Sequence, residues 1–176
     1  MKVLWFSNTP SLYNEGKHNY FGGGWIESLE RLIQLQEDID LAVSFFHETD
    51  DRKVKKGGST YYPIKLKKDK VNPVKRIINN WSGNVSGVKN FEKQALNVIN
   101  DYKPDIIQVF GSEGYFGLVQ NLTEIPVVIH IQGLINPYLN TYYPVNKSEV
   151  DFFIYKSYTV KNLLGNSPAF GKKRFK

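Results

Sequence analysis

Apolar and polar positions alternate in two different rhythms along the chain, which predicts strands and helices in turn. Residues 2–6 form an apolar run that predicts a strand, and a long polar loop follows. The triplet Gly22-Gly23-Gly24 then precedes a stretch with helical spacing, whose predicted buried face holds Trp25, Leu29, Leu32, Ile33 and Gln36. Residues 39–46 predict a buried strand, so the chain opens with a strand–helix–strand unit.

The middle of the chain continues this alternation. A short strand is predicted over 60–64, and Pro63 suggests a sheet edge because proline has no amide to donate. Residues 73–81 carry a basic amphipathic stripe ending in Trp81, a pattern typical of a core helix but also of a helix in a membrane interface. A further helix is predicted to bury Val88, Phe91, Ala95, Val98, Ile99 and Tyr102.

The last part of the chain predicts buried parallel strands at 104–110 and 125–131. Ser112 is placed to cap a helix that runs to about Leu122, and residues 149–164 predict a final helix. The whole pattern predicts an α/β fold in a single domain over residues 1–176. We expect a doubly wound, mostly parallel, Rossmann-like sheet with helices on both faces.

A doubly wound sheet binds ligands beyond the carboxyl ends of its strands, where the strand order reverses. That point is expected between the first and fourth predicted strands. The polar residues expected there lie on separate connections: Ser7, Asn8 and the Gly22 to Gly24 loop; Gly111, Ser112 and Glu113; and Gln132. Capping explains Ser112 equally well, and a turn explains Asn8 equally well.

The glycine triplet at the start of a predicted helix favours phosphate binding. Backbone amides can approach an anion there, and the helix dipole attracts it. Two common phosphate motifs do not fit. Glu27 stands where the dinucleotide fingerprint needs its last glycine, and no Gly-Lys-Ser/Thr follows the triplet. Alternatively, these glycines only form the loop that precedes the helix.

Composition and charge narrow the function classes. The sequence has no cysteine, which excludes disulfides, thiolate catalysis and thiolate metal sites. No apolar run approaches the ~20 residues of a membrane span, and no signal peptide is recognisable, so we expect a cytoplasmic protein. The net charge is +6, and the basic residues cluster at 53–56, 65–76 and 172–176. Such clusters are solvated faces or contacts to an anionic membrane; nucleic acid is not the expected partner.

Several short motifs occur in a familiar order and spacing: Met1-Lys2-Val3-Leu4-Trp5, Gly22-Gly23-Gly24-Trp25 heading a helix, Lys103-Pro104-Asp105-Ile106-Ile107, and residues 126–134. Together, to about Pro144, they resemble the amino-terminal half of a glycosyltransferase family 4 enzyme. That family has two Rossmann-like domains across a cleft and transfers a sugar from a nucleotide-sugar with retention. Its first domain serves mainly the acceptor. The resemblance implies that amides near Gly23 and Gly24 approach the donor diphosphate.

The chain departs from the family pattern at its last motif. The family often has a histidine before the glycine of a His-Gly pair, where this chain has Gln132. Gln132 cannot act as a base but can hydrogen-bond a sugar. His130, inside an apolar strand, is interpreted as a core histidine. The candidates for positioning the acceptor are Glu113, Gln132 and Asn136, and those for lining its cleft are Asn8, Gly111 and Ser112.

Asp38 and Asp40 imitate the metal-binding pair of a different transferase fold, but they are expected at the opposite end of the sheet. No metal is therefore expected. No other cofactor is expected either, because the nucleotide-sugar is a substrate.

The predicted function is the acceptor-side half of a retaining glycosyltransferase that moves a sugar to a glycan or lipid-linked acceptor. We expect a truncated enzyme, inactive alone, without the family's nucleotide-binding second domain, and in peripheral contact with the inner membrane face. One alternative is a non-catalytic α/β module that binds an anionic membrane or nucleic acid through its basic face. Another is a different nucleotide-sugar enzyme of the same plan, such as an epimerase.

Overall fold

A computed structural model describes residues 1–14, 24–48, 52–65, 87–112, 114–131, 145–146 and 151. The chain divides into two compact units, one of residues 1–67 and 88–132 and the other of residues 68–87 and 133–176. The elements described below belong to the first unit. The predicted helix at 73–81 lies outside the described residues, as does that at 149–164 apart from Asp151. The single-domain organisation stays a prediction.

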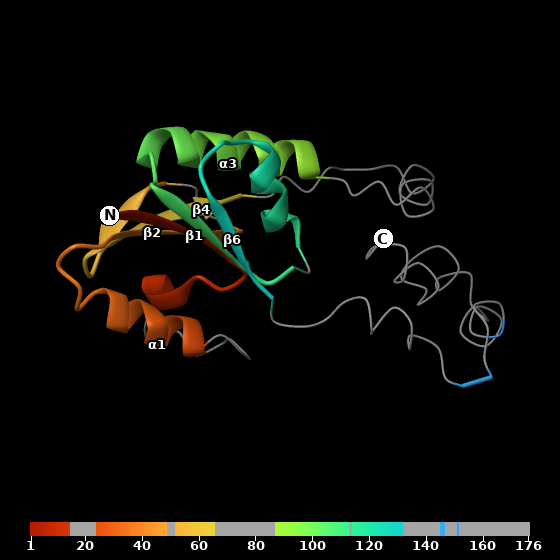
Figure 1. Cartoon of the computed structure of the whole chain (residues 1–176), viewed down its shortest axis with the longest axis horizontal. Helices are drawn as coiled ribbons and strands as arrows, with labels where there is room; N and C mark the ends of the chain where they lie inside the picture. The colour runs from red at the N-terminus through yellow and green to blue at the C-terminus, as the bar shows by residue number, and fades with distance from the viewer. Residues whose placement is uncertain are drawn as a thin grey trace. The chain divides into compact units, whose positions relative to one another are not determined.

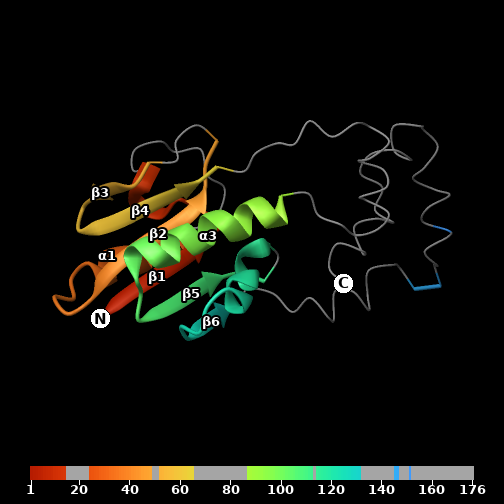
Figure 2. The same ribbon diagram turned by 90° about the horizontal axis from the view of Figure 1, so that it is seen from above.

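The described residues form a six-stranded sheet in the order β3-β4-β2-β1-β5-β6 (Figures 1 and 2). Parallel pairing joins β4 to β2, β2 to β1, β1 to β5 and β5 to β6, whereas β3 runs antiparallel to β4. The predicted α/β fold with a mostly parallel, doubly wound sheet is confirmed, and the strand order reverses between β1 and β5 as expected. The strands are β1 (Lys2–Ser7), β2 (Asp40–Phe46), β3 (Val54–Lys56), β4 (Ser59–Ile64), β5 (Ile106–Phe110) and β6 (Val127–His130).

Helical elements cover both faces of the sheet (Figures 1 and 2). One face carries α1 (Gly24–Ile33) and the 3-10 helix η1 (Ser11–Asn14), and the other carries α3 (Val88–Tyr102) and the 3-10 helix η2 (Tyr115–Asn121). Neighbouring strand residues point to opposite faces, so each strand supplies two cores. The core under α1 contains Val3, Trp5, Ile26, Leu41, Val43, Phe45, Tyr61 and Phe110. The core under α3 includes Leu4, Phe6, Phe91, Ala95, Ile99, Ile107, Val109 and Phe116.

Helix α1 buries only part of the predicted face, because Leu29 and Ile33 are half-buried and pack on the core. Ile26 and Glu30 are its buried residues, whereas Trp25 is 43% exposed and Leu32 is 60% exposed. The predicted face contained both exposed residues and left out Glu30. Hydrogen bonds from η1 and β4 allow this carboxylate to be buried, and the apolar pattern alone carried no sign of them. The buried face predicted for α3 is confirmed for Phe91, Ala95, Val98, Ile99 and Tyr102.

The sheet edge next to β4 was also predicted wrongly. β3 forms a hairpin with β4, so β4 is an inner strand. Pro63 is accommodated because the pairing with β3 ends at Tyr61, and Pro63 lies opposite Phe45 of β2.

The predicted cap at Ser112 is also wrong. η2 begins at Tyr115 with Gly114 at its N-cap, and no side chain caps it. The segment is a 3-10 helix that starts further along the chain than the prediction placed it.

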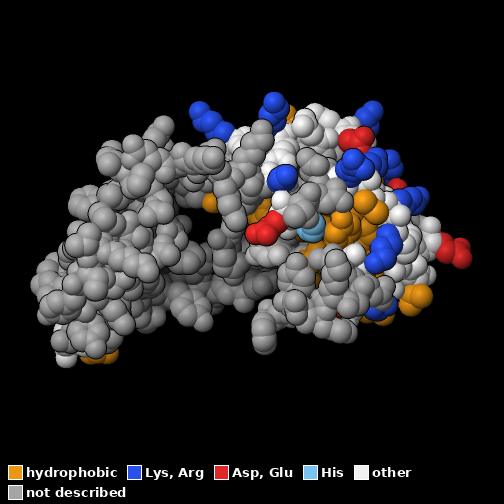
Figure 3. Space-filling view, turned by 180° about the vertical axis from the view of Figure 1, so that it is seen from behind, with side chains coloured by type: hydrophobic (Ala, Val, Ile, Leu, Met, Phe, Trp, Pro, Cys, Tyr) orange, Lys and Arg blue, Asp and Glu red, His pale blue; other side chains and the backbone are white. Residues whose placement is uncertain are grey.

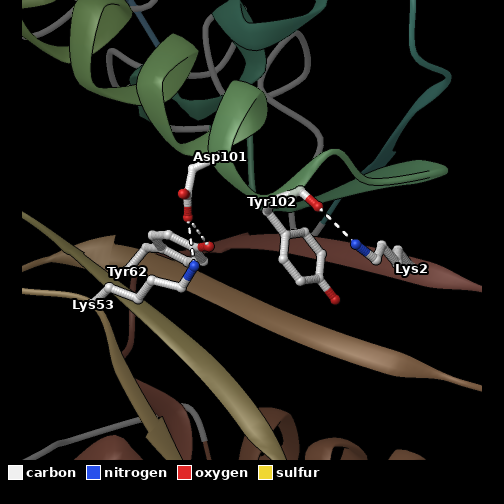
Figure 4. Close-up of polar contacts among 5 residues, drawn as sticks. All are labelled: Lys2, Lys53, Tyr62, Asp101 and Tyr102. Carbon is white, nitrogen blue, oxygen red and sulfur yellow. Dashed lines mark hydrogen bonds and ion pairs between the residues drawn. The ribbon is translucent and has the colours of Figure 1, made fainter.

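A polar cluster fixes the end of α3 to the strands (Figure 4). Asp101 accepts hydrogen bonds from Lys53 and from the Tyr62 hydroxyl, both at 2.6 Å. The Tyr102 hydroxyl donates to the backbone oxygen of Asp40 at 2.6 Å. The bonds from Lys53 and Tyr62 lower the pKa of Asp101, and burial raises the pKa of Tyr102 and Tyr62. This cluster lies away from the carboxyl ends of β1 and β5.

Candidate functional site

The edge of the sheet where β1 and β5 end is the candidate site, because the strand order reverses there. β1 ends at Ser7, whose side chain is buried and accepts a hydrogen bond from the Thr9 amide at 3.1 Å. This local bond turns the chain out of the sheet and leaves Asn8 exposed. The loop after β1 therefore begins with a fixed turn and presents an amide side chain.

The loop after β5 lies beside Asn8. The Oδ1 atom of Asn8 lies 3.7 Å from the point that a Cβ on Gly114 would occupy. Gly111 has a φ of +88°, a left-handed conformation that favours glycine, and its amide donates to the His130 oxygen at 2.9 Å. This turn holds the ends of β5 and β6 together. Ser112 follows it and is half-buried.

Helix α1 begins at Gly24 after the connection from β1. A Cβ at Gly24 would meet no described atom within 4 Å, and α1 is ten residues long. The first turn of an α-helix has unpaired amides and a partial positive charge. This end of α1 is suited to an anionic ligand.

Glu30 is a buried structural residue that sequence reasoning did not single out. Its side chain is fully buried, and its oxygens accept hydrogen bonds from the Leu12 amide at 3.2 Å, the Tyr61 hydroxyl at 2.5 Å and the Gln34 side chain at 3.3 Å. A single carboxylate thereby joins η1, α1 and β4. The position of Glu30 one turn after Ile26 was the available signal, since residues four apart share a helix face.

The η1 segment is held from other directions as well. Lys56 of β3 donates to the backbone oxygens of Leu12 and Tyr13, each at 3.3 Å. The Tyr13 ring packs against Phe45 and Tyr61 at centroid distances of 4.9 Å and 5.5 Å. The first part of the connection between β1 and α1 is therefore fixed over the sheet.

His130 is not a core residue, which corrects the interpretation from the sequence. It is exposed on β6, the edge strand of the described sheet, and its ring lies 5.2 Å from that of Trp25. The apolar residues around it in the sequence suggested burial. On this strand, however, the residues that pack inward are Val127 and Ile129, which have the opposite parity.

The structure brings together part of the predicted site. Asn8 lies beside the loop that carries Gly111 and Ser112, and Gly24 opens α1. Gly22, Gly23, Glu113, Gln132 and Asn136 lie outside the described residues, so their roles stay predictions. Asp38 and Asp40 lie at the amino end of β2, away from this edge, as expected.

Neither a metal centre nor a membrane span is found in the described part of the chain. There, no group of three or more histidine and acidic side chains is arranged to hold a metal ion. No helix in the described ranges is long and apolar enough to cross a bilayer.

Two of the basic residues on or beside β3 have partners within the protein. Lys53 pairs with Asp101, and Lys56 donates to η1. In a view of one side of the molecule, Lys and Arg side chains are interspersed with acidic and hydrophobic ones (Figure 3).

Comparison with known proteins gives a structural relation only. No family model matches the sequence, and no curated protein matches it. Among solved structures, the chain is similar to sucrose-phosphate synthase from Thermosynechococcus elongatus, with a TM-score of 0.52 and 10% sequence identity. The match covers 89% of this chain and 39% of that one, so the chain spans well under half of its length. The chain thus shares the fold of part of that protein.

Proposed function

We propose that the chain is the acceptor-side half of a retaining glycosyltransferase of family 4, acting as part of a longer protein. The observation that carries the proposal is that Asn8 lies beside the loop after Gly111, and that Trp25 in the first turn of α1 contacts Phe110 at the end of β5, both where the strand order reverses. Ligands of doubly wound folds bind at that point. The fold shared with sucrose-phosphate synthase supports sugar transfer as the chemistry.

Donor binding is assigned to the start of α1. Amides of Gly22, Gly23 and Gly24, together with the helix dipole, would stabilise the negative charge of the leaving diphosphate. That charge increases as the bond between the anomeric carbon and the phosphate oxygen breaks. Hydrogen-bond donors that point at this developing negative charge contribute more to catalysis than contacts that are equally strong in the ground state and the transition state.

Acceptor binding is assigned to the residues after β5 and β6. Glu113, Gln132 and Asn136 follow the carboxyl ends of these strands in the sequence, and Asn8 and Ser112 lie on the neighbouring loops. Their side chains supply carboxylate, amide and hydroxyl groups that can hydrogen-bond sugar hydroxyls. Holding one hydroxyl close to the anomeric carbon accounts for the role of this half, because positioning alone lowers the barrier of a two-substrate reaction.

The decisive experiment measures sugar transfer from a panel of nucleotide-sugars. We expect transfer by the longer protein and none by the 176-residue chain. Conversion of the nucleotide-sugar without transfer would favour an epimerase. If the longer protein neither transfers sugar nor binds nucleotide-sugars, the proposal is wrong and a membrane- or nucleic-acid-binding module replaces it.

A charge placed at the start of α1 tests the donor assignment. Gly24→Asp in the longer protein puts a carboxylate where the diphosphate is proposed to bind, and the Cβ that it adds meets no described atom within 4 Å. We expect the KM for the donor to rise about tenfold or more, with folding stability retained because an acidic group suits a helix start. Gln36→Asp, on an exposed position after α1, is the matched control. An unchanged donor KM in Gly24→Asp would contradict the donor assignment.

A further inference from the structure

An aromatic cluster lies at the same edge of the sheet, formed by Trp25, Phe110 and His130. The Trp25 ring meets Phe110 edge-on, with centroids 5.4 Å apart and planes at 75°. It meets His130 at 5.2 Å with only 33° between the planes, and Phe110 and His130 are 6.0 Å apart. Each ring therefore contacts the other two.

Sheet register explains why these rings meet. Phe110 of β5 lies directly opposite His130 of β6, so both side chains project from the face that α1 covers. Trp25 is in the first turn of α1 and reaches them from the helix. Phe110 is 1% exposed and also packs edge-on against Trp5 at 4.9 Å, so the base of the cluster belongs to the core.

The outer part of the cluster is exposed. Trp25 keeps 43% of its surface accessible, and His130 is exposed beside it. Val128, two residues before His130 on the same face of β6, is 50% exposed. The Trp25 indole packs against Phe110 and His130 and is still 43% exposed, so it is ordered before a ligand binds and stacking on it costs little side-chain entropy.

We infer that Trp25 and His130 form a stacking site for a pyranose ring of the acceptor. The inference rests on the proposed function, which assigns sugar acceptors to this half of the enzyme. The C–H groups of a pyranose face pack on the indole, and the imidazole of His130 hydrogen-bonds a ring hydroxyl. The amide of Gly111 donates to the His130 oxygen, which places this platform beside the loop assigned to the acceptor.

Binding by the 176-residue chain tests the platform directly. Saturation-transfer NMR is run with the methyl glycosides of glucose, galactose and mannose and, in separate samples, with UMP and GMP. We expect transfer to at least one glycoside, and a loss of about tenfold in affinity for Trp25→Ala, in line with the effect of removing an aromatic stacking partner. Trp25→Phe is expected to retain most of the binding.

Leu32→Ala is the matched control, because Leu32 is on the same helix and 60% exposed. Circular dichroism checks that each variant is folded. Binding of the glycosides that is absent, or that is the same in Trp25→Ala as in Leu32→Ala, would overturn the inference. Trp25-dependent binding of UMP or GMP without glycoside binding would overturn it in favour of a nucleobase site.

Kinetics of the longer protein separate this inference from the proposed function. Trp25→Ala is expected to raise the acceptor KM about tenfold while the donor KM stays close to the wild-type value. Transfer that continues with an unchanged acceptor KM would contradict the platform and leave the proposed function standing. Trp25-dependent glycoside binding in a protein that transfers no sugar would contradict the proposed function and leave the platform standing.

Discussion

The Glu30 carboxylate is fully buried between α1, η1 and β4, where it accepts hydrogen bonds from the Leu12 amide and the Tyr61 hydroxyl. Glu30→Ala removes both acceptors and leaves a cavity, so we expect a loss of about 3 kcal/mol in the free energy of unfolding. Glu30→Gln keeps one oxygen and should lose about 1 to 2 kcal/mol. Urea unfolding followed by circular dichroism measures both. Equal stability of Glu30→Ala and Glu27→Ala, an exposed position on the same helix, would contradict this role.

The turn at Gly111 gives a second prediction about a single residue. Its φ of +88° strains any residue with a Cβ, and its amide is bonded to the His130 oxygen. We expect Gly111→Ala to lower the free energy of unfolding by about 1 to 2 kcal/mol. Gly24→Ala is the control, because a Cβ there meets no atom of the described residues within 4 Å. Unfolding curves that coincide for these two variants would show that the turn at Gly111 carries no strain.

The residues that sequence reasoning misread share a physical cause. Glu30 has a polar side chain, and only its partners on η1 and β4, far away in the sequence, make its burial favourable. His130 sits in an apolar run, but its exposure follows from the position of β6 at the edge of the described sheet. In both cases the deciding contact lies between elements, which a local pattern does not contain.

At the scale of elements, the end of α3 is fixed to the sheet by hydroxyl groups. Burial raises the pKa of Tyr102 in the folded chain above its ordinary value of 10.0, so the folded state holds this proton more tightly than the unfolded state does. The resulting stability is complete below pH 10 and declines as the pH rises above it. Burial raises the pKa of Tyr62 as well.

We expect the free energy of unfolding to fall above about pH 10, by up to about 1.4 kcal/mol per pH unit for each such tyrosine. Tyr102→Phe should reduce this slope by about 1.4 kcal/mol per pH unit, because one ionisable group is removed. Below pH 10 it should lower stability by about 1 kcal/mol, because the hydrogen bond to the Asp40 oxygen is lost. Urea unfolding between pH 8 and 11 measures both effects. If the free energy of unfolding falls equally steeply with pH in the wild-type chain and in Tyr102→Phe, burial of Tyr102 does not oppose its ionisation.

Long periodic elements could be predicted, and short ones could not. The apolar face of α3 repeats over fifteen residues, and the strand patterns of β1, β2 and β5 are continuous, so both were assigned correctly. β3 has three residues, Val54–Lys56, of which two are lysines, and its pairing depends on the turn before β4. Without β3, the proline in β4 suggested an edge that the hairpin in fact covers.

At the scale of the whole molecule, the position of the candidate site rests on the order of strands and helices more than on any single motif. Alternating strands and helices with right-handed crossovers place the reversal of order between β1 and β5, and the structure has it there. The motif with the clearest chemistry, the glycine triplet, is described only at Gly24. Topology therefore located the edge, whereas the identity of the ligand depends on side chains that experiments must test.

The net charge of +6 leads to a prediction for the whole chain. We expect it to sediment with vesicles of phosphatidylglycerol and phosphatidylcholine at 50 mM salt, and not with phosphatidylcholine alone, because each basic residue near an anionic surface contributes about 1 kcal/mol. At 0.5 M salt the screening length is shorter than 10 Å, so the protein should be released. Lys55→Ala, on the exposed strand β3, should weaken binding, whereas Lys53→Ala should have less effect because Lys53 is paired with Asp101. Retention at 0.5 M salt, or equal binding to neutral vesicles, would show that apolar insertion rather than charge holds the protein at the bilayer.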